Sequence, residues 1–142
     1  MKRVYVNENW CLGCRLCEYH CAFAESRQKD MARALRGVKI NPAIRIEANN
    51  GISFAVSCRH CKQPLCVKAC ITGALHITNG IITADKARCV GCYTCILSCP
   101  FGAISQNETG VIQKCELCTA SHGSPACVKG CPNNALVYEE RE

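Results

Sequence analysis

Apolar and polar residues alternate along residues 44–56, whose sequence is IRIEANNGISFAV. The alternation runs on both sides of residues 49–51, Asn-Asn-Gly, and an Asn-Gly pair favours a tight turn between two antiparallel strands. This segment therefore predicts a β-hairpin. Similar turns at residues 79–80 and 109–110 are each followed by two apolar residues, and they predict two further hairpins.

A repeated sequence begins at three of the cysteines. The stretches that start at Cys70, Cys99 and Cys131 read CITGAL, CPFGAI and CPNNAL. Each predicts a helix that stops after the cysteine, a turn at Gly or Asn, and a short strand. The sequence after Cys21, AFAES, has neither Pro nor Gly, so we expect that helix to continue. The pattern as a whole predicts an α+β fold of short helices, hairpins and extended loops.

Cysteine is unusually abundant, with sixteen in 142 residues. Such a density indicates either disulfides or bound metal. Disulfides need an oxidising compartment, and the first residues, MKRVYVNE, have no apolar run behind the basic pair, so we expect no signal peptide. No stretch approaches the roughly 18–20 apolar residues of a membrane span. We therefore expect a cytoplasmic protein whose cysteines bind metal.

The sixteen cysteines fall into four sets of four. Every set opens with C-x2-C and closes with C-x3-C, and only the middle interval varies. The sets are Cys11, Cys14, Cys17 and Cys21; Cys58, Cys61, Cys66 and Cys70; Cys89, Cys92, Cys95 and Cys99; and Cys115, Cys118, Cys127 and Cys131.

This spacing is typical of [4Fe-4S] clusters. A C-x2-C loop turns tightly enough to place two thiolates on neighbouring corners of a small inorganic cube, and the third cysteine takes another corner. The fourth, one helical turn further on, points to a second cube, as in bacterial two-cluster ferredoxins. Cys99 is then a ligand of a different cluster from Cys89, Cys92 and Cys95. Zinc is the rival metal, but four-cysteine zinc sites usually join two C-x2-C pairs through a longer spacer.

The order of the sets favours two nested units within one compact chain, 1–142. Residues 58–104 resemble a complete two-cluster ferredoxin, and residues 1–57 and 105–142 would form a split outer unit, with 22–57 as an insertion. Sequential pairing of the sets, one with two and three with four, stays open. The nested ligand groups are Cys58, Cys61, Cys66 with Cys99; Cys89, Cys92, Cys95 with Cys70; Cys11, Cys14, Cys17 with Cys131; and Cys115, Cys118, Cys127 with Cys21.

The net charge of +6 does not indicate nucleic-acid binding, because anionic clusters need basic side chains as counter-charges. Basic residues do gather between Glu25 and Arg45, where only two acidic residues oppose them. Two interpretations stay open: a docking surface for an acidic partner, or a solvated helix. The basic residues are Arg27, Lys29, Arg33, Arg36, Lys39 and Arg45.

The stretches SCRHCKQPLCVKAC and CVGCYTCILSCPFGAI, with four such sets in this order, resemble the four-cluster iron–sulfur subunits of the dimethyl sulfoxide reductase B / hydrogenase-4 component B family. The resemblance covers residues 4–138. It implies a double ferredoxin-like fold with nested ligation and four [4Fe-4S] clusters. Ala22 and Ile71 stand where the family pattern often has Pro, which alters the helix exits without removing a ligand.

No nucleotide-binding, P-loop or zinc-protease motif occurs, so the chain is predicted to carry electrons rather than catalyse a reaction. The main hypothesis is an electron-transfer subunit of an oxidoreductase complex, and the alternatives are a free polyferredoxin and a zinc-stapled interaction module. On family resemblance, the partner is a hydrogenase, formate dehydrogenase, carbon monoxide dehydrogenase, tungsten aldehyde oxidoreductase or flavin transhydrogenase, with a ferredoxin as a second partner.

Six other residues carry weaker signals. The histidines are expected to be solvated or to lie just outside the ligand shell, and the two aromatic residues beside cysteines are expected to pack rather than to shield a cluster. These residues are His20, His60, His76, His122, Trp10 and Tyr93.

Overall fold

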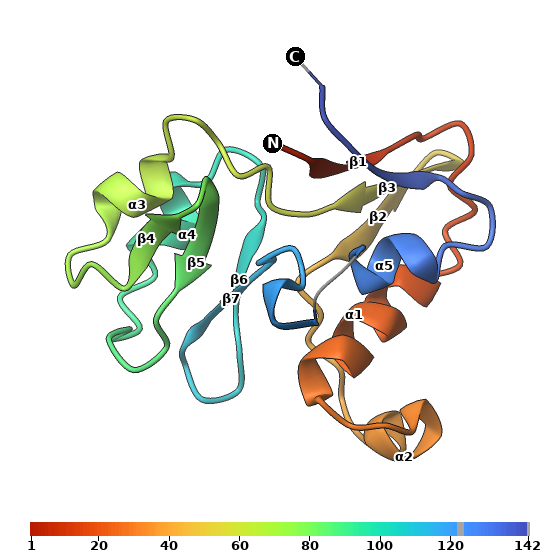
Figure 1. The fold of residues 1–142 in the computed structure, drawn as a ribbon, viewed down its shortest axis with the longest axis horizontal. Coiled ribbons are helices and arrows are strands. Elements are labelled where there is room, and N and C mark those ends of the chain that lie inside the picture. Colours follow the sequence, from red (N-terminus) through yellow and green to blue (C-terminus); the bar gives the residue numbers. More distant parts are fainter. Residues whose placement is uncertain (122–123, 142) are drawn as a thin grey trace.

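The computed structural model describes residues 1–121 and 124–141, and it has the predicted mixture of helices and short strands. Figure 1 shows short helices set between two-stranded hairpins rather than one large sheet. The helices are α1 (Leu16–Ser26), α2 (Met31–Leu35), α3 (Leu65–Ala69), α4 (Thr94–Ser98), α5 (Ala126–Lys129) and the 3-10 turn η1 (Thr119–Ser121). The strands are β1 (Arg3–Val6), β2 (Arg45–Asn49), β3 (Ile52–Val56), β4 (Leu75–Thr78), β5 (Ile81–Ala84), β6 (Ile104–Gln106), β7 (Ile112–Lys114) and β8 (Leu136–Glu139).

All three predicted hairpins are confirmed. Strands β2 and β3 pair antiparallel with Asn49 opposite Ile52, and Asn50 and Gly51 form the turn with positive φ angles of 49° and 79°. Strands β4 and β5 pair around the turn at residues 79–80, and β6 pairs with β7 across residues 107–111. Ile46 and Ala55, which lie opposite each other in β2 and β3, are both buried, and burial of one face helps to fix a hairpin register.

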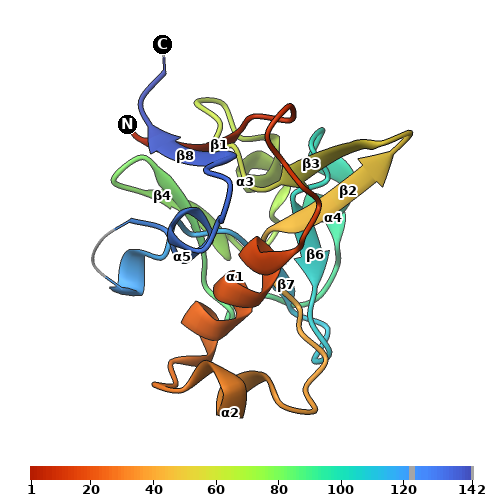
Figure 2. The same ribbon diagram turned by 90° about the vertical axis from the view of Figure 1, so that its right-hand side faces the viewer.

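A fourth strand pair joins the two ends of the chain, and the sequence did not reveal it. Strand β1 pairs antiparallel with β8, with Arg3 opposite Glu139 and Val6 opposite Leu136. Figure 1 and Figure 2 both place the N-terminal and C-terminal ends close together beside this pair. The first and last strands are therefore parts of one structural unit.

The helices that follow the cysteine loops are short, except for the first. Helices α3, α4 and α5 have five, five and four residues, whereas α1 continues for eleven, as the absence of Pro and Gly after Cys21 predicts. The three short helices end before the fourth cysteine rather than after it. Cys70 and Cys99 are C-cap residues with extended backbone, so only in α1 does the fourth cysteine of a set lie within the helix.

The three repeated sequences turn where they were expected to. Gly73, Gly102 and Asn134 have positive φ angles of 66°, 59° and 51°, and β4, β6 and β8 begin two residues after each of them. A left-handed residue reverses the chain as it leaves a helix, and Gly and Asn adopt that conformation at least cost.

Buried side chains form two separate clusters. The first contains Cys66, Leu75, Ile82, Cys95, Ile104 and Ile112. The second contains Val4, Cys17, Cys21, Ala43, Ile44, Ile46, Ala55, Leu117, Cys127 and Leu136. Cysteines contribute to both clusters. Figure 1 shows α3, α4, β4 and β5 at one end of the molecule and α1, α5, β2 and β3 at the other.

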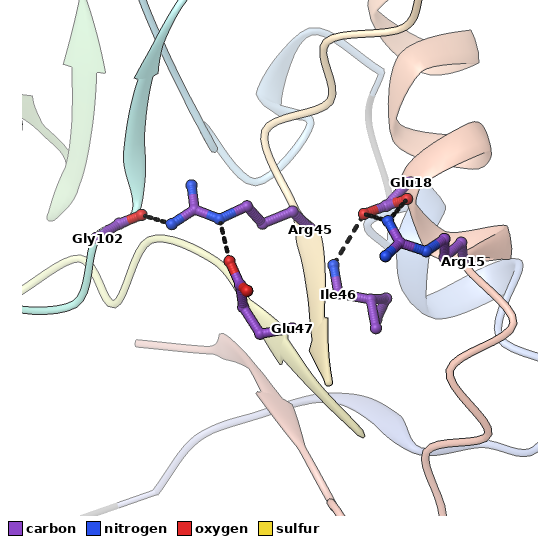
Figure 3. Close-up of polar contacts among 6 residues, drawn as sticks. All are labelled: Arg15, Glu18, Arg45, Ile46, Glu47 and Gly102. Carbon is purple, nitrogen blue, oxygen red and sulfur yellow. Dashed lines mark hydrogen bonds and ion pairs between the residues drawn. The ribbon is translucent and has the colours of Figure 1, made fainter. Parts of the chain in front are cut away.

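Polar contacts attach β2 to elements on either side of it (Figure 3). The backbone N–H of Ile46 donates to Glu18 Oε1 of α1 at 2.8 Å, and the Glu18 carboxylate also lies 3.4 Å from Arg15. Arg45 donates to the carbonyl oxygen of Gly102 and, at 2.9 Å, to Glu47. The hairpin of the 22–57 segment is thus attached to α1 on one side and to the residues just before β6 on the other. None of the helices among the described residues is long and apolar enough to span a membrane.

Candidate iron–sulfur sites

The four C-x2-C loops share one backbone conformation. In every loop the residue just before the second cysteine has a positive φ angle: 68° at Gly13, 45° at His60, 71° at Gly91 and 56° at Leu117. This left-handed residue gives the turn that brings the first two cysteines of each set together. Gly adopts the conformation freely, whereas an L side chain pays roughly 1–2 kcal/mol for it.

His60 and Leu117 offset that cost by packing. Both side chains are buried, at 1% and 4% exposure, so each fills space that a glycine would leave empty. Their backbone N–H groups also face sulfur: His60 N lies 3.5 Å from Cys58 Sγ, and Leu117 N lies 3.4 Å from Cys115 Sγ. N–H groups that face a cysteine sulfur stabilise its anionic, metal-binding form.

Cys58, Cys61 and Cys66 lie around Cys99 from the next set. Burial raises the pKa of the Cys61 and Cys66 thiols, and the nearby Cys58 and Cys99 sulfurs raise it further. Such mutual effects act between groups that lie close together. Cys99 is brought there by α4, which packs against α3, the helix that carries Cys66.

Cys89, Cys92 and Cys95 are placed beside Cys70 in the same way. Burial raises the pKa of the Cys95 thiol to about 11, with contributions from Cys70 and Cys89. Cys92 is exposed, and hydrogen bonds from Thr94 lower the pKa of its thiol. The Thr94 hydroxyl lies 3.5 Å from Cys92 Sγ.

A third group is formed by Cys11, Cys14, Cys17 and Cys131, which line one small pocket together. Burial raises the pKa of the Cys17 thiol to about 11, with smaller contributions from Cys11 and Cys14. The contact of α1 with α5 brings Cys131 to this pocket from the far end of the sequence.

The fourth group contains Cys21, Cys115, Cys118 and Cys127. Burial raises the pKa of the Cys21 thiol to about 12 and that of the Cys115 thiol to about 11. Burial also raises the pKa of the Cys127 thiol, and the nearby sulfurs of Cys115, Cys21 and Cys118 raise it further. A cavity of about 660 Å³ is lined by Cys21, Cys115 and Cys118. Cys21 and Cys115, which are more than ninety positions apart in the sequence, therefore line the same cavity.

The chemistry of these groups fits iron–sulfur clusters. Thiolates are the soft ligands that such clusters use, and bound metal deprotonates a buried thiol that would otherwise stay neutral. Among residues 1–121 and 124–141, no three His, Cys, Asp or Glu side chains converge closely enough to hold a single metal ion. A tetrahedral zinc site needs four sulfur ligands at about 2.3 Å from one ion, whereas a [4Fe-4S] cube takes one thiolate at each of its four irons.

The weaker sequence signals have different outcomes. His60 is buried rather than solvated: its Nδ1 accepts a hydrogen bond from Ile82 N at 3.1 Å, and burial, with Lys114 and Arg3 nearby, lowers its pKa to about 3. His76 is exposed and bonds to Thr83, and His122 lies outside the described residues. His20 is half-buried against Gly130.

The two aromatic residues also differ. Trp10 is 55% exposed, so the expectation that it packs is wrong in this structure. Tyr93 packs against the buried cluster that contains Cys95, as expected.

Sequence reasoning missed one basic residue of the site. Lys114, at the end of β7, is only 5% exposed. Its ammonium group donates to the carbonyl oxygens of Ile82 and Cys115, the latter at 2.6 Å. Because Lys114 immediately precedes Cys115, the sequence could have indicated that its ammonium group is a counter-charge for the thiolates.

Short helices and hairpins that carry cysteines in four groups define a small ferredoxin-like iron–sulfur protein. A comparison with protein families matches residues 50–141 to the 4Fe-4S dicluster domain, and the chain belongs to this family. Its relatives are iron–sulfur electron-transfer proteins, and the chain is one of them rather than a catalytic subunit.

Three relatives illustrate the relationship. The chain is 35% identical to an iron–sulfur protein of Rhodospirillum rubrum, over 94% of this chain and 79% of the relative. It is 32% identical to the electron transport protein HydN of Escherichia coli (92% and 83%) and 36% identical to PhsB, the thiosulfate reductase electron transfer subunit of Salmonella typhi (93% and 72%).

A solved structure shares the fold. It is that of the active-site complex BamBC of benzoyl coenzyme A reductase with benzoyl-CoA, in which one chain superposes with a TM-score of 0.53. The match covers 99% of this chain and 80% of that one, at 22% identity.

Proposed function

We propose that this protein is the electron-transfer subunit of an oxidoreductase complex and that it carries four [4Fe-4S] clusters. It passes single electrons between a catalytic subunit and a second redox partner. The observation that carries this proposal is the gathering of all sixteen cysteines into four groups of four. Iron–sulfur clusters exchange one electron at a time, and their potentials respond to hydrogen bonds to sulfur and to burial.

The ligation is nested in this proposal. Each cluster takes three cysteines from one set and its last from another, so Cys99 serves the cluster of Cys58, Cys61 and Cys66. The influence of Cys99 on the pKa of Cys61 and Cys66 supports this pairing. The other clusters pair Cys70 with the third set, Cys131 with the first and Cys21 with the fourth.

The two buried clusters support the corresponding division of the chain except at Ile112, which lies in the outer range but packs in the cluster of the central unit. Residues 58–104 form a central ferredoxin-like unit, and residues 1–57 and 105–142 form an outer one that is closed by the β1–β8 pair. Two such units in one chain correspond to the four-cluster subunits of the dimethyl sulfoxide reductase B / hydrogenase-4 component B type.

The catalytic partner is an oxidoreductase. Relatives are named as an electron transfer subunit of thiosulfate reductase and as the electron transport protein HydN. We place this chain in a complex of the hydrogenase, formate dehydrogenase, carbon monoxide dehydrogenase, tungsten aldehyde oxidoreductase or flavin transhydrogenase type, in the cytoplasm.

Metal analysis of anaerobically purified protein tests the proposal. Four cubes require about sixteen irons and about sixteen acid-labile sulfides per chain. Half of that amount would overturn the count of four, and iron-poor protein without sulfide would overturn the iron assignment. Native purification tests the subunit role, because a subunit brings its partner with it in fixed proportion. A chain that elutes alone from its host would instead support a free shuttle.

A further inference from the structure

The segment 27–39, here called the basic arm, concentrates positive charge on one projection of the molecule. It contributes five basic residues and one acidic residue, and therefore +4 of the net charge of +6. All five basic side chains are exposed, and that of Arg33 is 87% exposed. The basic residues are Arg27, Lys29, Arg33, Arg36 and Lys39.

The basic arm is an ordered structure. Asp30 caps α2, because its carboxylate accepts hydrogen bonds from the N–H groups of Ala32 at 3.0 Å and Arg33 at 3.3 Å. Ala34 is buried, and α2 packs against α1. In both ribbon views α2 projects beyond the end of α1, away from the hairpins. The cations are thus held on a fixed projection and face water.

Neutralising the cluster sites does not account for these charges. An exposed cation is screened by salt over a Debye length of about 8–10 Å, so it stabilises a buried anion weakly. A counter-charge for a buried anion lies within the protein, as Lys114 does. Of the five basic residues in the arm, only Arg33 forms an ion pair among the described residues, with Asp30 at 3.6 Å. The charges remain available to a partner.

The basic arm adjoins one of the cysteine groups. Arg27 and Gln28 line the same cavity of about 660 Å³ as Cys21, Cys115 and Cys118. Lys86, which is exposed, adds a further positive charge to the wall of this cavity, and Glu25 and Glu116 are the acidic residues there. A protein seated on the basic arm would therefore lie beside the fourth cysteine group rather than at the far end of the molecule.

We propose that the basic arm docks an acidic one-electron carrier protein of the ferredoxin type beside the group formed by Cys21, Cys115, Cys118 and Cys127. This inference rests on the proposed function. The reduced carrier is oxidised by one electron, and this chain is reduced by one; no bond forms or breaks, and the potentials set the direction. Charge complementarity selects an acidic carrier, because clustered cations on one projection steer an oppositely charged protein to that place.

Charge reversal on the basic arm tests the proposal. The variant Arg33→Glu/Arg36→Glu is compared with Lys62→Glu/Lys68→Glu, which makes the same change in net charge beside and within α3, at the other end of the molecule. The probe is a purified acidic ferredoxin, reduced and mixed anaerobically with the iron-loaded chain in a stopped-flow spectrophotometer. Rate constants are measured at low, intermediate and high salt.

At low salt we expect the second-order rate constant to fall at least about 10-fold in the arm variant and less than about 3-fold in the control. At high salt the arm variant and the wild type should converge. A second arm variant, Arg36→Glu/Lys39→Glu, leaves the Arg33–Asp30 pair in place and should show the same loss. Reduction by dithionite, a small reductant that needs no docking surface, should be equal in all variants.

Two results would overturn the inference and leave the proposed function in place. Equal rates for the arm variants and the wild type would show that the basic arm does not guide the carrier. An equal loss in the α3 control would show that only net charge matters. An iron-free wild-type chain would overturn the proposed function together with this inference, whereas an iron-loaded chain with unchanged rates would overturn this inference alone.

Discussion

The ammonium group of Lys114 donates a hydrogen bond to the carbonyl oxygen of Ile82, so that a residue at the end of β7 is fixed to the middle of β5. The N–H of the same residue, Ile82, donates to Nδ1 of His60 at 3.1 Å. The N–H and the carbonyl oxygen of one buried strand residue are therefore both hydrogen-bonded to side chains from distant parts of the sequence. His60 lies between Cys58 and Cys61 in the sequence, and Lys114 immediately precedes Cys115.

Replacing Lys114 by Met should destabilise the protein although it keeps the length of the side chain. The substitution leaves the carbonyl oxygen of Ile82 without its donor, and a buried unsatisfied group costs about 1–3 kcal/mol. We expect the apparent Tm of the iron-loaded chain to fall by roughly 4–10 °C. Lys68→Met, an exposed position, is the control and should change little. Equal melting of the two variants would contradict this role for Lys114.

Replacing Cys99 by Ser distinguishes the two pairing schemes. Nested ligation predicts that Cys99→Ser alters the same cluster signal, seen by electron paramagnetic resonance during a redox titration, as Cys66→Ser does. Sequential ligation predicts that it alters the signal lost in Cys127→Ser. The three variants are compared in anaerobically purified protein. A match with Cys127→Ser would refute the nested scheme.

Glu18 attaches α1 to β2, and its removal should be costly. The Glu18 side chain is buried and accepts the hydrogen bond that Ile46 N donates. Glu18→Ala leaves that N–H buried without an acceptor, so we expect a loss of about 1–3 kcal/mol in chemical denaturation.

Two matched variants separate the hydrogen bond from the ion pair of Glu18. Glu18→Gln keeps an oxygen acceptor and should lose less than Glu18→Ala. Arg15→Ala removes only the partner of the ion pair, which is 57% exposed, and should cost at most about 1 kcal/mol. If Arg15→Ala were as damaging as Glu18→Ala, the ion pair rather than the Ile46 bond would be the important contact.

Gly130 marks the close approach of α5 to α1. A methyl group at this position would overlap the imidazole ring of His20, so Gly130→Ala must push the two helices apart or displace the ring. Crowding of this kind typically costs 1–3 kcal/mol, and we expect about that loss. Because α1 and α5 carry Cys17 and Cys127, the variant should also lose iron faster on dilution into chelator.

A second substitution checks the cause of that loss. His20→Ala removes the ring that the new methyl group would meet, so His20→Ala/Gly130→Ala should recover most of the stability lost by Gly130→Ala alone. If the stability lost by the double variant equals the sum of the losses of the two single variants, Gly130→Ala destabilises the protein through the backbone at Gly130 and not through overlap with His20.

Local features of the fold could be predicted from the sequence. The hairpin at residues 45–56 depends on its own Asn-Gly turn and alternating side chains, which act over a few residues. The long first helix followed from the missing Pro and Gly after Cys21. The position of α2 could also have been found, because Asp30 before an Ala- and Leu-containing stretch is a helix-start signal.

Long-range features could not be predicted in this way. Nothing near Arg3 in the sequence identifies Glu139 as its strand partner, because that pairing depends on the packing of distant segments. The burial of His60 and Lys114 depends in the same way on Ile82, which lies 22 and 32 residues away from them. The cysteine spacing predicted [4Fe-4S] clusters, because the spacing is typical of their ligands, but it left nested and sequential pairing of the four sets open.

The pairing of β1 with β8 has a consequence for how the protein is made. Translation completes β1 more than 130 residues before its partner strand leaves the ribosome. The first strand therefore waits, unpaired, until nearly the whole chain has been synthesised, and a polypeptide truncated before residue 136 would leave the edge of β1 open to other partners.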